Sequence, residues 1–308
     1  MLTDAQNLAV VRTELDTVFF QTFDHEGGAG TGMAVATTGE IFRQQPLDRL
    51  AWIGEVNLGP GFFSQVGETQ TVPEANVRVA NKYTINAIDY AESISLSKDF
   101  FDDQMHGVWA EQTRQLSLMA LASQNNNAFG LWRGAFTTTL CADGVALIGT
   151  HNLLSGSTYS NSVSGALTTT TLNNAFTSLY QQPNQAGVIM GNEPAFLLVS
   201  AKGLKNAVEI TDSVLVSDSG NNAVNFYRSM LGIKVYASPY LGAAAGGSDT
   251  AWFLASKRHS VTRLVRQGVQ TALRDWTQSN NRSYLYQANF RESYFAPDYA
   301  GVVGSTGV

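Results

Sequence analysis

A long run of helix-forming residues, from Asp102 to Trp132, constrains the fold of this chain most strongly. Asp102 and Asp103 can cap its start, and Arg133 followed by Gly134 supplies a cationic last turn and a stop. The run predicts a helix over about 103–132, far longer than the mean globular helix of about 11–12 residues. Its apolar residues recur at three- and four-residue steps: Val108, Trp109, Leu116, Met119 and Ala120. Such a helix is a backbone on which other elements pack, and the asparagines at 125–127 are where it would bend or stop.

The chain is poor in charged residues. They make up 14% of its 308 residues, against about 25% in typical domains, and the net charge is -6. A surface of small polar groups suits extensive contact with other chains, because few charges must lose their water. The net negative charge argues against a surface that binds nucleic acid tightly through counterion release. Cys141 is the single cysteine, so neither an intrachain disulfide nor a cysteine zinc cluster can form.

The residues before the helix predict an arm, a hairpin and a strand. Leu8, Val11, Leu15 and Phe19 form a helical stripe, and a glycine-rich stretch follows, so residues 1–36 read as an arm that packs on something else. Two extended segments around Gly59-Pro60-Gly61 predict a long hairpin within 40–82. Its polar composition gives it little core of its own, so it should lie against a neighbour. Residues 83–98 alternate as one strand, with a bulge expected at 91–93.

The residues after the helix predict a compact α/β module. Val145 to Ile148 reads as a short apolar strand, and a Ser/Gly/Asn loop follows it. Alternating helices and strands are then expected at 172–180, 188–189, 195–199, 201–210, 232–237 and 251–255. Residues 283–295 alternate again and could pair with 83–98. No apolar run is long enough to span a membrane, and the N-terminus lacks a secretory pattern, so a cytoplasmic product is the default.

No constellation of side chains defines an active site. Asp24-His25-Glu26 lacks a helical face and a second cluster, and a metal site at Asp102, Asp103 and His106 would need carboxylates from elsewhere. His151 has no nucleophile motif beside it and is expected to bond backbone. The basic residues predict a solvated or subunit-contacting face: Lys257, Arg258, Arg263, Arg266 and Arg274. We therefore assign no catalytic residue, no metal site and no cofactor, and expect a structural protein.

The order of elements over about 83–300 resembles the major head subunit of Mu-like tailed phages. An alternating strand leads through SKDFFDDQ into the long helix, and CADGVALIGTHNLLSGSTYSN follows. The family carries an Asp-Gly-Val-Ala-Leu-type segment and a histidine after its spine helix, as Asp143 to Leu147 and His151 do here. The helix at 172–180, the run at 195–210 and the strand at 232–237 follow in the expected order.

The resemblance implies an α+β chain with the major capsid fold first seen in phage Hong Kong ninety-seven. Its parts would be an N-terminal arm (1–36), an extended β-hairpin loop (37–82), a peripheral domain with the spine helix (83–148), an α/β axial domain (149–256) and a return to the peripheral domain (257–308). The polar loops at 212–222 and 242–249 would then point towards five- and six-fold centres.

The implied function is a structural major capsid protein of a tailed phage or prophage. Its pentamers and hexamers would form an icosahedral shell that encloses double-stranded DNA. Expected partners are other copies, a separate scaffolding protein, a portal, decoration proteins and DNA held without sequence specificity, with assembly in the bacterial host cytoplasm. Contacts between copies are expected at Trp52, Ile53, Leu58, Phe62, Phe63, Glu68 and Arg78. Lys82 is the only lysine of the loop and lies at its base, so joining is expected to be noncovalent.

Two alternatives stand beside this interpretation. An encapsulin-like compartment would share the fold and would need a cargo-loading groove. A soluble metal-dependent enzyme would use Asp102, Asp103 and His106.

Overall fold

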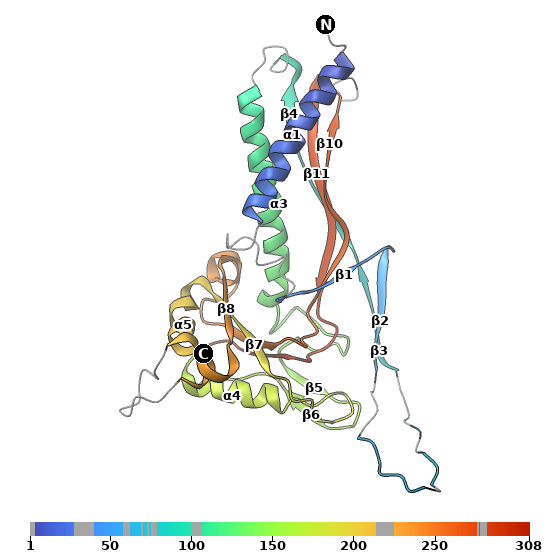
Figure 1. Ribbon diagram of the computed structural model, residues 1–308, viewed down its shortest axis with the longest axis vertical. Coiled ribbons are helices and arrows are strands. Elements are labelled where there is room, and N and C mark those ends of the chain that lie inside the picture. The colour runs from blue at the N-terminus through green and yellow to red at the C-terminus, as the bar shows by residue number, and fades with distance from the viewer. Residues whose placement is uncertain are drawn as a thin grey trace.

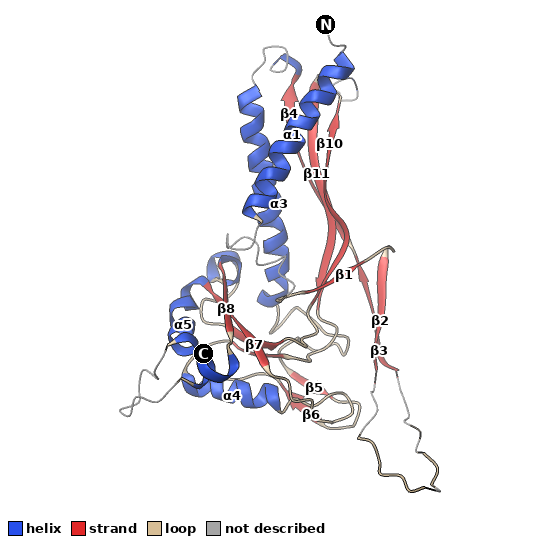
Figure 2. Cartoon of the chain, viewed as in Figure 1, coloured by secondary structure: helices blue, strands red, loops and turns tan. Residues whose placement is uncertain are grey.

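The computed structural model describes residues 4–27, 40–57, 62–68, 70–72, 74, 79–99, 106–213, 225–275, 277 and 282–308. Figure 1 shows an elongated part, in which long helices and strands run side by side, joined to a lobe of shorter helices around a second sheet. A two-stranded hairpin stands beside the lobe, and its loop extends away from both parts. The predicted α+β class is confirmed, and Figure 2 shows helices and strands mixed in both parts.

The elongated part packs two long helices on a four-stranded sheet. The strand order is β1-β10-β11-β4, with β1 parallel to β10 and the other neighbours antiparallel. Helix α3 packs against β11, and α1 packs against α3. The bounds are Asp4–Glu26 for α1, His106–Arg133 for α3, Arg43–Pro46 for β1, Ile88–Ser97 for β4, Thr262–Arg274 for β10 and Ser283–Phe295 for β11.

Helix α3 is the predicted long helix, and it continues through the asparagine run to Arg133. Asn125 is buried, and its Nδ2 donates to the carbonyl oxygen of Leu121 at 3.1 Å, so this amide is satisfied within the helix. The expected caps Asp102 and Asp103 lie outside the described residues. The chain leaves the helix at Gly134, whose amide donates to the carbonyl oxygen of Gly130.

The apolar stripe predicted for α3 splits between two faces. Trp109, Leu116 and Ala120 are buried, whereas Val108 and Met119 are 44% and 58% exposed. At 3.6 residues per turn, positions 108 and 119 fall on one side of the helix, about a quarter turn from the buried three. Three- and four-residue spacing therefore identified the helix but assigned two of its five apolar residues to the wrong face.

The N-terminal helix α1 packs on its own chain. Val11, Leu15 and Phe19 are buried in a cluster with residues of α3 and β11. Ser117 of α3 also donates its hydroxyl to the carbonyl oxygen of Phe19 at 3.0 Å. The stripe is thus confirmed as a packing surface, but the expectation that the arm gains its order from neighbouring subunits is wrong for these residues. The glycine-rich residues 28–32 lie outside the described part of the chain.

The single strand expected at 83–98 is two strands, because the chain changes partners at Ala87. Strand β3 (Val79–Asn86) pairs with β2 (Ala51–Asn57), whereas β4 pairs with β11. The β4–β11 register runs in step from Ser97 opposite Ser283 to Ile88 opposite Glu292, so the bulge expected at 91–93 is wrong. The pairing expected between 83–98 and 283–295 is confirmed through β4.

The lobe is an α/β module around the sheet β12-β9-β7-β8. The central strand β7 is parallel to β8 and antiparallel to β9. Thr168 and Thr171 form a capping box at the start of α4. The bounds are Thr169–Tyr180 for α4, Leu204–Asp212 for α5, Pro194–Ser200 for β7, Lys234–Ser238 for β8, Trp252–Ser256 for β9 and Val302–Ser305 for β12, with short turns η2 (Ala201–Gly203), η3 (Tyr227–Leu231), η4 (Pro239–Leu241) and η5 (Ala243–Ala245).

Four segments of the lobe differ from expectation. Residues 188–189 form only an isolated bridge between Pro183 and Ile189 rather than a strand. Residues 145–148 form only an isolated bridge between Leu140 and Ala146 rather than a strand, because Leu147 and Ile148 turn into the core. The loop expected after them contains the hairpin of β5 (Thr150–Asn152) and β6 (Thr158–Ser160). Strand β12 comes from the C-terminal segment that was expected to return wholly to the peripheral domain, and it pairs with β9 instead.

A shared hydrophobic core joins the end of α3 to the lobe. Phe129 and Trp132 of α3 are fully buried together with Leu198 of β7 and Phe253 of β9. The rings of Trp132 and Phe253 lie 5.1 Å apart between centroids. Each buried aromatic side chain of this size removes a large apolar area from water. The long helix is therefore anchored in the lobe at its C-terminal end and packed against α1 over its N-terminal half.

Candidate subunit interface

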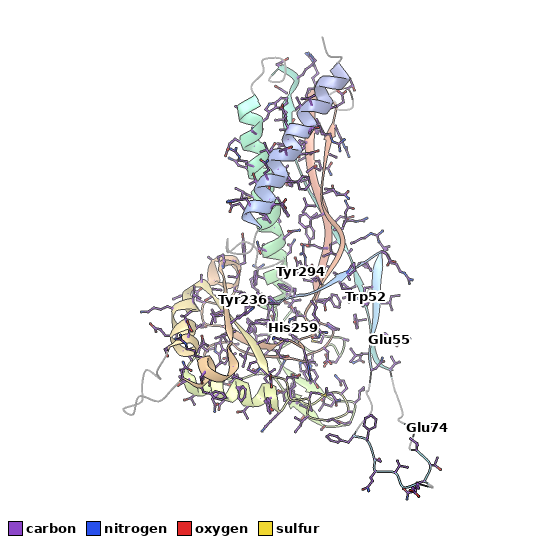
Figure 3. All side chains as sticks on the ribbon, in the orientation of Figure 1. Trp52, Glu55, Glu74, Tyr236, His259 and Tyr294 are labelled. Atoms are coloured by element: carbon purple, nitrogen blue, oxygen red, sulfur yellow. The ribbon has the colours of Figure 1, made fainter. Side chains whose placement is uncertain are left out.

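The base of the hairpin is attached to the chain's own sheet. Trp52 of β2 and Tyr83 of β3 pack on a small cluster that contains Leu264 and Phe295, and Figure 3 labels Trp52 on the strand near the sheet. Gly54 lies under the Tyr83 ring, where a Cβ would come within 2.3 Å of ring atoms. A larger residue at Gly54 would displace that ring, so the close approach fixes how the hairpin leaves the sheet.

The outer part of the hairpin has no such support. Ile53 points away from Trp52 because alternate residues of a strand face opposite sides, and it is 70% exposed. Phe62 and Phe63 are 82% and 99% exposed. Adjacent phenylalanines with this much exposure are uncommon on the surface of a soluble monomer.

The loop also carries the acidic residues of the hairpin tip. Glu68 and Glu74 are exposed, and Figure 3 places Glu74 on the projecting loop. Residues 58–77 contain neither lysine nor arginine. Of the expected contact residues, Trp52, Ile53, Phe62, Phe63 and Glu68 are described, whereas Leu58 and Arg78 lie outside the described residues. The described tip is therefore apolar and anionic, and Trp52 is the one expected contact that faces its own chain.

An ion pair links the two strands at the base of the same hairpin. Lys82 Nζ lies 3.3 Å from Glu55 Oε1 across β2 and β3. Both side chains are largely in solvent, where such a pair contributes about 0–1 kcal/mol. The pair holds the loop's lysine at the base, away from the tip.

The buried residue His151 of the lobe belongs to a cluster with Asp143 and Tyr299. His151 Nδ1 is 2.7 Å from Asp143 Oδ2, and its ring stacks on Tyr299 with 4.5 Å between centroids. The expectation that His151 bonds backbone is therefore wrong for this nitrogen. Burial would raise the pKa of Asp143, but hydrogen bonds from His151 and from the amide of Val145 outweigh it, so the pKa lies below its ordinary value. This cluster ties β5 to the turn at Asp143 and to the C-terminal segment.

Cys141 is not available as a nucleophile. Burial, with the nearby carboxylates of Asp143 and Asp298, raises the pKa of its thiol well above the usual range. Because the thiolate is the reactive form, this cysteine remains an inert core residue.

The expected basic face breaks up because Arg263 is buried. Its Nε and Nη2 donate to Glu292 Oε2 at 3.0 Å and 2.7 Å across β10 and β11. Tyr294 donates its hydroxyl to the other oxygen of Glu292. Burial raises the pKa of Glu292 in spite of the guanidinium beside it. Charged residues are rarely buried unless they are paired. Sequence reasoning missed this pair because nothing near Arg263 in the sequence indicates that Glu292 is its partner.

Of the two metal candidates predicted from the sequence, only the Asp24-His25-Glu26 stretch lies in the described part of the chain. His25 Nδ1 contacts Glu26 at 3.2 Å in the exposed last turn of α1. Asp102 and Asp103 lie outside the described residues, as does the side chain of His106. Within the described ranges, no three His, Cys, Asp or Glu residues are grouped so that they could hold a metal ion. The helices of those ranges are also too short or too polar to cross a membrane.

The chain thus combines a long helix on a long sheet, an α/β lobe and a projecting hairpin whose loop carries two exposed phenylalanines. The chain belongs to the phage capsid protein family, whose model matches residues 82–304. No curated protein matches the sequence.

Solved capsid structures share the fold at low sequence identity. A Microbacterium phage Oxtober96 chain has a TM-score of 0.53 and 13% identity, over 88% of this chain and 90% of that one. The capsid of the native GTA particle, computed with C5 symmetry, has a TM-score of 0.55 and 13% identity, over 88% and 89%. A virus-like particle from Pyrococcus furiosus has a TM-score of 0.51 and 9% identity, over 95% and 98%.

These findings identify a structural major capsid protein located in the virion capsid. The capsid fold inferred from the order of elements is confirmed. The fold alone does not separate a phage capsid from another protein shell, and the family match is what favours the phage capsid.

Proposed function

We propose that this subunit builds the head of a Mu-like tailed phage or prophage, in pentamers and hexamers of an icosahedral shell around double-stranded DNA. The observation that carries the proposal is the pair Phe62 and Phe63, which are 82% and 99% exposed. They belong to the hairpin loop, which projects from the molecule (Figure 1). In this proposal the loop docks on a neighbouring copy. The C5 symmetry of the GTA capsid supports five-fold rings in this fold.

Burial of the loop tip supplies a substantial part of each contact. Covering a phenylalanine fully contributes about 1.5–3 kcal/mol, and both side chains start from nearly complete exposure. A contact between the tip of one copy and a different surface of the next is heterologous, and such contacts close into rings when the rotation allows. Many modest contacts multiplied by symmetry then hold the shell.

In the same proposal the lobe around β7 takes the axial position, and the elongated part of α3, β10 and β11 forms the periphery. The axial loop expected at 212–222 falls mostly outside the described residues, whereas 242–249 forms short turns in the lobe. Strand β12 goes with the axial part, since it pairs with β9.

The remaining partners follow from the family resemblance and from charge. The net charge of -6 supports loose, sequence-independent contact with packaged DNA. A scaffolding protein, a portal, decoration proteins and assembly in the host cytoplasm stay predictions. Lys82 pairs with Glu55 at the hairpin base, away from the loop. This position supports the proposal that subunits are joined noncovalently.

The test replaces both tip phenylalanines in the full-length chain. The variant F62A/F63A should fold and remain soluble but should fail to form shells in negative-stain electron microscopy. The matched control is Phe20→Ala, the same chemical change on the outer side of α1, which should assemble. Trp52→Ala is a poorer test, because Trp52 packs on its own chain and its loss disturbs the hairpin itself. Normal shells from F62A/F63A would contradict the proposal.

A further inference from the structure

A cleft of about 690 Å³ lies on the lobe where the first residues of β7 and β8 meet the turn after β9. Its apolar lining includes Phe196 and Leu231, and its charged rim includes Lys234, Lys257 and Arg258. Lys257 and Arg258 are both exposed. The cleft therefore combines an apolar floor with cations that point into solvent.

The charges of the cleft are only partly balanced. Glu40 accepts hydrogen bonds from the ammonium of Lys234 and the hydroxyl of Tyr236, and these bonds lower the pKa of its carboxyl. Lys234 is thereby neutralised. The positive charge of Lys257 also acts on Glu40, but among the described residues neither Lys257 nor Arg258 lies within ion-pair distance of a carboxylate. Glu193 is the other carboxylate of the lining. A chain of net charge -6 thus presents a locally cationic cleft.

The cleft also borders an open sheet edge. Strand β8 is the last strand of its sheet, and β7 is its only strand partner in the described part of the chain. The backbone groups along its outer side can therefore pair with an extended segment from another chain.

We propose that this cleft receives the hairpin loop of a second copy of the chain. The described loop residues complement the cleft. In this proposal Phe62 and Phe63 cover its apolar floor, and Glu68 and Glu74 form ion pairs with Lys257 and Arg258. The stretch 58–77 has no basic residue that the cleft cations would repel. The inference rests on the proposed function and names the surface on which the loop docks.

The loop cannot fill the cleft of its own subunit in this arrangement. In Figure 3 Glu74 lies on the projecting loop, well apart from Tyr236, which shares Glu40 with Lys234 and lies in the upper part of the lobe near the elongated part. The hairpin base is held by Trp52 in the sheet cluster, so the loop cannot swing back without breaking that packing. The donor is therefore a neighbouring copy.

A charge exchange in the full-length chain tests the pairing. The loop variant E68K/E74K and the cleft variant K257E/R258E each place like charges opposite one another. We expect either to raise the concentration needed for assembly about tenfold, which corresponds to about 1.4 kcal/mol. The combined variant restores opposite charges and the native net charge, and it should assemble close to the wild-type concentration in sedimentation experiments.

The matched control pairs the loop variant with a reversal elsewhere on the lobe. Lys202 and Lys205 are 76% and 87% exposed and lie outside the cleft lining. The variant E68K/E74K/K202E/K205E has the net charge of the combined variant but leaves the cleft cations in place. It should remain defective. Rescue by this control would mean that net charge decides assembly, and it would overturn the inference.

A disulfide experiment gives an independent readout. E68C/R258C should form crosslinks between copies after mild oxidation of assembled particles, and Cys141 is buried and should not take part. The proposed docking site is wrong if no crosslink forms and the combined charge variant is not rescued. If F62A/F63A still fails to assemble in that case, the proposed function stands. If F62A/F63A assembles as well, both fail. If K257E/R258E assembles normally but its particles hold less DNA, the cleft faces nucleic acid and the inference is wrong.

Discussion

Truncating Phe19 to alanine should destabilise the isolated, unassembled subunit. Phe19 is fully buried in the cluster that α1 shares with α3 and β11, and its ring lies 6.1 Å from Phe23 and 6.4 Å from Tyr286 between centroids. A buried Phe→Ala change costs about 3–5 kcal/mol, because transfer free energy is lost and a cavity remains. In a chain of this length, that loss lowers the melting temperature by roughly 5–8 °C.

The adjacent residue supplies the control. Phe20 is 36% exposed, so Phe20→Ala removes the same atoms from a site that is already partly in water. Its effect should be about 1 kcal/mol or less. Scanning calorimetry of dissociated subunits measures both changes, and amide hydrogen exchange over residues 9–26 reports whether α1 opens first.

The outcome distinguishes a helix that belongs to the subunit from an arm that rests on its neighbours. If α1 packs on its own chain, F19A weakens the lone subunit. An unchanged melting temperature in lone subunits, together with failed assembly, would refute the self-packed helix and restore the arm that lies on neighbours.

Three further predictions concern buried or partly buried charged groups. Arg263→Met should cost about 3–5 kcal/mol in urea unfolding, because it leaves the Glu292 carboxylate buried without its partner, whereas R263M/E292L should lose less; equal losses would contradict this reasoning. The lowered pKa of Asp143 means that its pairing with His151 stabilises the fold fully above the ordinary carboxyl pKa of about 3.9. This contribution is lost as pH falls through the lower folded-state pKa, so Asp143→Asn should destabilise the protein at pH 7 and progressively less at acidic pH. Asp298 has a pKa raised by burial, so its ionisation opposes folding as pH rises, and Asp298→Asn should gain stability relative to wild type above that pKa; a constant difference across pH would contradict both assignments.

Local periodicity was enough to predict the helix α3 and the strands β4 and β11, and their pairing was inferred as one that two alternating strands could make. Both signals depend on residues close in sequence, and β11 alternates between buried and half-buried residues from Tyr284 to Glu292. The break at Ala87 could not be predicted in this way, because alternation continues through it while the partner strand changes. The sequence pattern records which face of a strand is buried and not which strand covers it.

The same limit explains why the sequence did not show what covers helix α1 or which residue pairs with the buried Arg263. The stripe of Val11, Leu15 and Phe19 predicts a buried face, but only the fold reveals that Trp109 and Leu116 cover it. Arg263 finds Glu292 across a strand pair separated by a long stretch of sequence. Partners that are distant in sequence leave no local signal in a single chain.

The candidate interface was predictable in part for the same reason. A polar hairpin with a Gly-Pro-Gly break indicates a loop without a core, and Phe62 and Phe63 are exposed as that argument requires. That Trp52 faces inward depends on the register of β2 against β3 and could not be read from composition. The cleft was missed because its lining comes from separate segments, around Glu40, β7, β8 and the turn after β9.

The size of the particle formed by the purified full-length chain tests the central claim most directly. Sedimentation velocity and electron microscopy on the same sample give its mass and shape. The account predicts closed shells, or rings of five and six subunits that convert to shells, far heavier than the 33.2 kDa subunit. A chain that stays a monomer or a small fixed oligomer at every concentration and salt tested, with its hairpin loop intact, would contradict the account.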